Sequence, residues 1–83
     1  PNPFNPTTVI GYALPEGSNV RLEIYNTLGQ VVRTLVDGEQ AGGVYRMTWD
    51  GRNEHGQEMA TGVYIYRIVA GDFQATKRML LIK

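Results

Sequence analysis

The chain has 83 residues, enough for one domain with a limited core, and its 8 basic and 8 acidic residues leave no net charge. This balance gives no attraction toward nucleic acid or an anionic membrane, so we expect neither partner. The absence of cysteine excludes disulfides and thiol chemistry, and the apolar run at residues 79–82 is far too short for membrane insertion.

The first third of the chain predicts an extended opening followed by two strands. Three prolines at residues 1–6 disfavour a helix, and we expect Phe4 to anchor this segment on the core. Strands are predicted at residues 7–14 and 20–25. The second alternates apolar and polar residues most clearly, which is typical of a half-buried strand.

The rest of the chain predicts four more strands, separated by turn residues. Residues 30–36 place apolar side chains on both faces, so we expect a bulge or a change of sheet there, followed by a long flexible turn at 37–43. Further strands are predicted at 44–49, 62–70 and 73–82, the last two joined by a tight turn. Six such runs predict an all-β sandwich of antiparallel strands, and no internal repeat is visible.

The aromatic residues of the central stretch predict where the core lies. Trp49 shares one face of its run with Tyr45, whereas Tyr64 and Tyr66 share one face of the following run. Large aromatic side chains bury much apolar area, so we expect Trp49 to be buried against Tyr64 or Tyr66.

Residues 50–61 predict a structured loop. Asp50 can accept a hydrogen bond from the backbone two residues later, Gly51 and Gly56 allow a positive φ, and Asn53 tolerates the left-handed region. The alternative is a cation site with the ligands Asp50, Asn53, Glu54 and Glu58. Calcium needs a ligand at nearly every second position, which this spacing lacks.

No residues in the sequence form a catalytic or metal-binding set. His55 is the single histidine, Ser18 is the single serine, and the glycines are not followed by a helix that could bind phosphate. We therefore expect no enzyme activity and no cofactor. A sugar-stacking platform of Tyr25, Tyr45 or Trp49 is an alternative, although their spacing fits core packing better.

Three motifs resemble the C-terminal sorting domains of bacterial type IX secretion cargo. They are the proline-rich opening at residues 1–10, the Trp-Asp-Gly-Arg-Asn stretch that leads into Gly-Val-Tyr-Ile-Tyr-Arg at 49–67, and the basic-then-apolar close at 76–83. The central motif is also similar to the immunoglobulin-like domain of the flagellar hook-cap protein. The resemblance covers the whole chain and implies one immunoglobulin-like β-sandwich of about six to seven strands over residues 1–83.

This resemblance also implies a function. Such a domain ends a secreted protein, passes through the periplasm, is recognised by secretion-apparatus proteins and is removed by a surface peptidase. The parent cargo would therefore lie upstream of Pro1, and the product would be secreted or held at the outer cell surface. The motifs place recognition at Gly62, Val63, Tyr64, Lys77, Arg78, Leu80, Ile82 and Lys83. From the residue patterns described above, we expect structural roles for Phe4, Trp49, Asp50, Gly51 and Tyr66.

Two other functions remain open from the sequence: an immunoglobulin-like spacer of an extracellular enzyme, and a carbohydrate-binding module. The final strand bears on this choice because Met79 and Leu81 share one face while Leu80 and Ile82 share the other. A sandwich strand needs only one apolar face. The second face is expected either to be covered by residues 1–6 or to form a docking patch flanked by basic residues.

Overall fold

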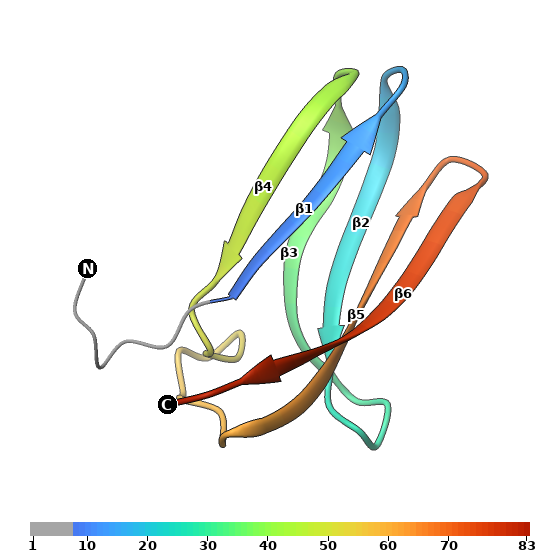
Figure 1. Ribbon diagram of the computed structural model, residues 1–83. Coiled ribbons are helices and arrows are strands. Elements are labelled where there is room, and N and C mark those ends of the chain that lie inside the picture. Colours follow the sequence, from blue (N-terminus) through green and yellow to red (C-terminus); the bar gives the residue numbers. More distant parts are fainter. Residues whose placement is uncertain (1–7) are drawn as a thin grey trace.

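The structure, a computed structural model, describes residues 8–83, and this part of the chain folds into strands and turns without a helix (Figure 1). The strands are β1 (Thr8–Leu14), β2 (Ser18–Tyr25), β3 (Val31–Gln40), β4 (Gly43–Trp49), β5 (Gly62–Ala70) and β6 (Phe73–Leu81). The all-β prediction is therefore confirmed. Within residues 8–83 we find no helix that could span a membrane.

The strands form two antiparallel sheets. One contains β1 and β4, and the other has the order β3-β2-β5-β6 (Figure 1). Between them lies a core to which both sheets contribute alternate residues, as the period-two pattern predicts. In β2, Val20, Leu22 and Ile24 are all fully buried. The other buried apolar residues are Ile10, Leu14, Val32, Trp49, Tyr64, Ile68, Ala70 and Leu81.

Strand β3 contains the expected irregularity. Its register with β2 shifts twice, so that Leu35 and Val32 have no direct partner on β2. Such bulges turn an extra residue of a strand toward the other face. Val32 is thereby buried and Leu35 packs against the core, which explains the apolar residues on both faces of this segment.

The long flexible turn expected at residues 37–43 is wrong. Strand β3 continues to Gln40, which pairs with Ser18 at the start of β2, and only Ala41 and Gly42 connect β3 to β4. Asp37 and Gly38 have low intrinsic strand preference, but their pairing with β2 overrides it. Asp37 also lies opposite Arg21 and forms an ion pair with it at 3.5 Å.

The loop between β4 and β5 closes the sandwich on the side of β3. The backbone N–H of Glu54 donates to the carbonyl of Val32 at 3.2 Å, and the Glu54 carboxylate accepts from the backbone N–H of Thr34. Arg33 donates to Asp50 Oδ1 at 3.2 Å and to the Arg52 carbonyl at 3.3 Å. These bonds use polar groups on the outer edge of β3 that another strand would otherwise pair with.

Two turns at residues 26–30 and 53–57 share the sequence Asn-x-x-Gly-Gln and the same hydrogen bonds. In each, the asparagine Oδ1 accepts from the backbone N–H groups two and four residues later, and its Nδ2 donates to the glutamine side chain. The glycines, Gly29 and Gly56, have φ values of 81° and 78°, a region that favours glycine. Asn53 itself has a negative φ, so its role is side-chain capping rather than the left-handed backbone. The expectation of no internal repeat is therefore wrong for this five-residue turn.

Candidate interaction surface on the last two strands

The pairing of β5 with β6 brings the two halves of the predicted recognition set together. Gly62 lies opposite Leu81, Val63 opposite Leu80, and Tyr66 opposite Lys77. Residues that are well separated in the sequence thus become direct neighbours across one pair of strands. Most of the predicted set therefore lies on one ladder at the edge of the larger sheet, while Ile82 and Lys83 follow the end of β6.

The inner side of this ladder belongs to the core. Tyr64, Met79 and Leu81 face inward, and Leu81 is fully buried. Tyr64 packs edge-on against Trp49, with ring centroids 5.1 Å apart, and donates its hydroxyl to the Ala60 carbonyl at 2.7 Å. Tyr64 is therefore a core residue whose ring offers almost no exposed surface.

The outer side of the ladder exposes apolar side chains. Leu80 is 55% exposed and lies opposite the half-buried Val63. Ile65, the next outward residue of β5, lies between Tyr25 on β2 and Arg78 on β6. We call these four apolar residues the outer patch: Tyr25, Val63, Ile65 and Leu80. Burial and the neighbouring Glu23 carboxylate both raise the pKa of the Tyr25 hydroxyl, which keeps that residue neutral.

The end of the chain extends this surface. Ile82 follows β6 and is 66% exposed, and the exposed Lys83 comes after it. Within the described residues, the ion pairs involve Arg21 and Arg33 and none of the basic residues of β6. Arg78 and Lys83 thus keep their charge available beside exposed apolar groups, an arrangement typical of protein interaction sites. The expected anchor Phe4, and with it the alternative cover by residues 1–6, lies outside the described residues.

Trp49 is confirmed as a buried core residue, with 0% exposure. Its Nε1 donates to the Arg52 carbonyl at 2.9 Å, so the polar group of the indole is satisfied inside the sandwich. Asp50 forms the expected turn by accepting from the Arg52 N–H at 3.0 Å, and Gly51 has a φ of 77°. Tyr66 faces inward and is half-buried against the core.

Two of the acidic side chains in the 50–61 loop, those of Asp50 and Glu54, are engaged by protein donors. Asp50 accepts from Arg33 and from its own turn, whereas Glu54 accepts from Thr34. No group of three or more acidic or histidine side chains gathers as metal ligands in residues 8–83. His55 is exposed in this loop, with its backbone N–H bonded to Asn53.

The aromatic platform considered for a sugar does not form. Trp49 is fully buried, and Tyr45 faces inward, where it stacks on Tyr12 with ring centroids 5.3 Å apart. Tyr25 alone remains on an outer face. These three rings therefore do not share a flat exposed surface, because the period-two pattern directs two of them into the core.

Comparison of the sequence with known proteins identifies similar domains. A family model described as the FlgD Ig-like domain matches residues 5–72. The basal-body rod modification protein FlgD of Salmonella typhimurium is 37% identical over 67 residues, which cover 80% of this chain and 29% of that protein. FlgD of Salmonella typhi matches to the same extent. The chain thus spans less than a third of the length of the curated relatives it matches.

Comparison of the structure gives the same fold. FlgD from P. aeruginosa superimposes with a TM-score of 0.69 at 28% identity, covering 90% of this chain and 58% of that chain. Dimeric latent PorU from Porphyromonas gingivalis superimposes with a TM-score of 0.68 at 24% identity, covering 96% of this chain and 8% of that one. The second likeness shows the fold alone. Together these similarities confirm the expected immunoglobulin-like β-sandwich.

Proposed function

We propose that this chain, which belongs to the FlgD Ig-like domain family, is a non-catalytic immunoglobulin-like module that carries a sorting signal for type IX secretion and cell-surface anchoring. In this proposal the signal lies on β5 and β6. Secretion-apparatus proteins bind it in the periplasm, and a surface peptidase later separates it from the cargo. The product is secreted or remains at the outer cell surface.

One observation carries this proposal: the β5–β6 ladder joins the resembling motifs into one surface with exposed apolar side chains. Leu80 and Ile82 point away from the core although neither is needed to close it, since Met79 and Leu81 supply the inner face. Exposed apolar side chains on an edge strand are a liability for a free protein. A partner that covers them during export gives these residues a use.

The proposal is tested by export of a reporter protein fused upstream of the 83-residue chain in a bacterium with type IX secretion. The double change Leu80→Ser with Ile82→Ser should leave the reporter in the periplasm while the circular dichroism spectrum stays that of the unchanged sandwich. The matched control is Val31→Ser with Val44→Ser, which removes two exposed apolar groups from other strands. Normal export of the folded β6 variant would refute the sorting role of this surface.

A second candidate is a structural module without a sorting signal. The 37% identity to FlgD, a basal-body rod modification protein, favours it. On this view the domain joins or stabilises other parts of a longer protein. It predicts that the unaltered chain fails to export any reporter, so the same experiment separates the two functions.

A further inference from the structure

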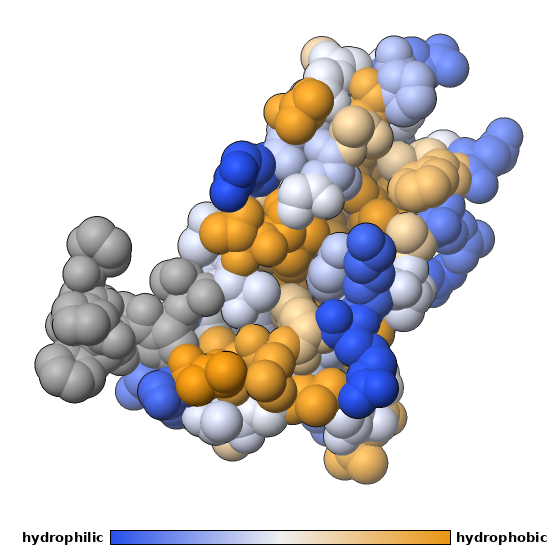
Figure 2. All heavy atoms as spheres, viewed as in Figure 1, coloured by the Kyte–Doolittle hydropathy of each residue, from blue (hydrophilic) through white to orange (hydrophobic). Residues whose placement is uncertain are grey.

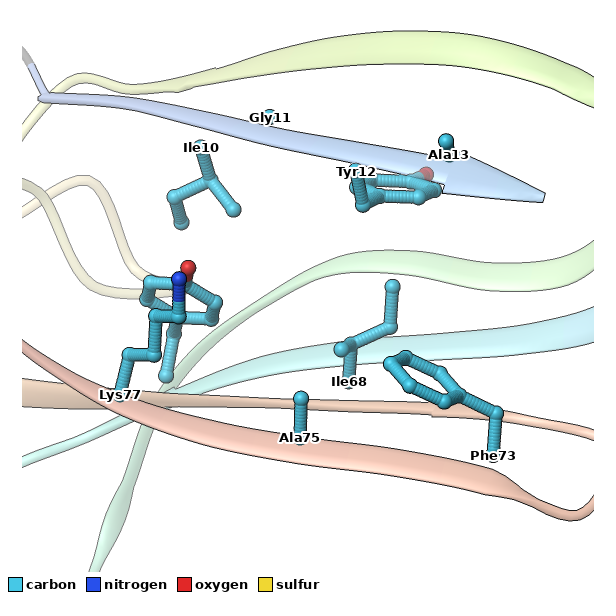
Figure 3. A pocket seen from close by; sticks show the side chains of 9 residues that line it. Ile10, Gly11, Tyr12, Ala13, Ile68, Phe73, Ala75 and Lys77 are labelled. Atoms are coloured by element: carbon cyan, nitrogen blue, oxygen red, sulfur yellow. The ribbon is translucent and has the colours of Figure 1, made fainter.

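A groove runs between β1 and β6 (Figure 3). Its wall is formed by four consecutive residues of β1, from Ile10 to Ala13, so the backbone edge of that strand lines it. Its floor is formed by alternate, inward-facing residues of the larger sheet: Tyr66, Ile68, Phe73, Ala75 and Lys77. A strand placed in this groove would run beside the edge of β1 and lie over every second residue of the larger sheet. Strands of a sandwich have these neighbours.

This strand position is vacant within the described residues. Strand β1 pairs with β4 on one side and with no strand on the other, whereas β5 and β6 continue the larger sheet beneath the free edge. Phe73 faces the groove and is 56% exposed. Figure 2 shows hydrophobic side chains along the space between β1 and β6. The smaller sheet is thus one strand too narrow to cover the apolar floor.

Lys77 distinguishes the groove from a purely apolar surface. It lies opposite Tyr66 on the inward face of β6, and Figure 3 shows its side chain directed into the groove near Ile10. The ion pairs in residues 8–83 leave Lys77 without an acidic partner. The charge of Lys77 disfavours a purely apolar strand packed above it. It favours a strand that brings a carboxylate to the same place.

We propose that this groove binds an extended peptide from another protein, which adds to the free edge of β1 as a third strand of the smaller sheet. The peptide presents apolar side chains at alternate positions to Phe73 and Ala75, and an acidic side chain to Lys77. Backbone hydrogen bonds to β1 supply affinity, and the pattern of side chains supplies selectivity. Antiparallel pairing places the acidic residue toward the peptide's carboxyl end, because Lys77 lies beside the start of β1.

The test uses the 83-residue chain and a blocked peptide of about seven residues, long enough to span the groove as a strand. Valine occupies its second and fourth positions, glutamate its sixth, and serine or threonine the others. In a nuclear magnetic resonance titration, we expect shifts at residues 10–13 and 73–77 and slower amide exchange in β1. A peptide with lysine in place of the glutamate should bind about two- to fivefold more weakly, as for an exposed ion pair.

Lys77→Glu should reverse this preference, so that the lysine peptide binds better than the glutamate peptide. Arg78→Glu is the matched control, because Arg78 faces the opposite side of the sheet and should leave the preference unchanged. Lys77→Gln, which should lose the preference without reversing it, serves if the charge reversal does not fold. Shifts outside the groove, or a preference insensitive to residue 77, would overturn the proposal. A dimeric sedimentation mass, together with slow amide exchange in β1 before any peptide is added, would also overturn it, because a second copy would then occupy this edge.

Discussion

Trp49 is the residue on which both sheets depend. It ends β4, packs edge-on against Tyr64 of β5, and donates to the Arg52 carbonyl in the loop between them. One side chain thereby links the small sheet, the large sheet and their connection. Its type and period-two position predicted this burial from the sequence alone, because an indole on a core-facing position has few alternatives in so small a domain.

Trp49→Ala should lower the free energy of unfolding by about 3–5 kcal/mol, the usual loss when a large core side chain is truncated. Urea denaturation followed by circular dichroism measures this change. Tyr45→Ala is a useful comparison, since Tyr45 also faces inward but is only half-buried. A loss for Trp49→Ala no larger than that for Tyr45→Ala would contradict the central role of the indole.

At the scale of elements, strands were predictable and their ends were not. Alternation was sufficient to predict β2, and Gly71-Asp72 was sufficient to predict the turn between β5 and β6, because each signal depends on neighbouring residues only. The extension of β3 to Gln40 depends instead on pairing with β2, a long-range contact that local preference does not show. The candidate surface was predictable in part. Leu80 and Ile82 follow from alternation and Val63 from the resembling motif, but Tyr25 and Ile65 join them only through the register of β5 with β2 and β6.

The two Asn-x-x-Gly-Gln turns allow a matched test at this scale. Asn26→Ala and Asn53→Ala each remove two hydrogen bonds to the backbone, so each should cost about 1–2 kcal/mol of unfolding free energy. Only the 53–57 turn contains Glu54, whose backbone N–H and carboxylate bond to the edge of β3. We therefore expect Asn53→Ala alone to accelerate amide exchange at Thr34. Equal exchange at Thr34 in both variants would show that the turn does not hold the loop against β3.

At the scale of the whole molecule, stability should fall in alkaline solution. Burial is the main cause that raises the pKa of Tyr12 and of Tyr25 above the ordinary value of 10.0. As pH rises through that value, the unfolded chain releases its phenol protons before the folded chain does. The associated stability is therefore fully present below about pH 10 and is lost as pH rises through the raised pKa values. Urea midpoints measured from neutral to strongly alkaline pH should decline, less steeply in Tyr12→Phe; a rise would contradict this assignment.

The ends of the outer strands determine how the molecule would respond to tension. Thr8 lies opposite Trp49, Leu81 lies opposite Gly62, and Trp49 packs against Tyr64, so the start of β1 and the finish of β6 share one end of the sandwich (Figure 1). A pull between these two points acts across the core and not along the strands. It loads the Thr8–Trp49 and Gly62–Leu81 pairs first and opens each ladder one rung after another. The sandwich is thus arranged to peel open at low force rather than to resist shear.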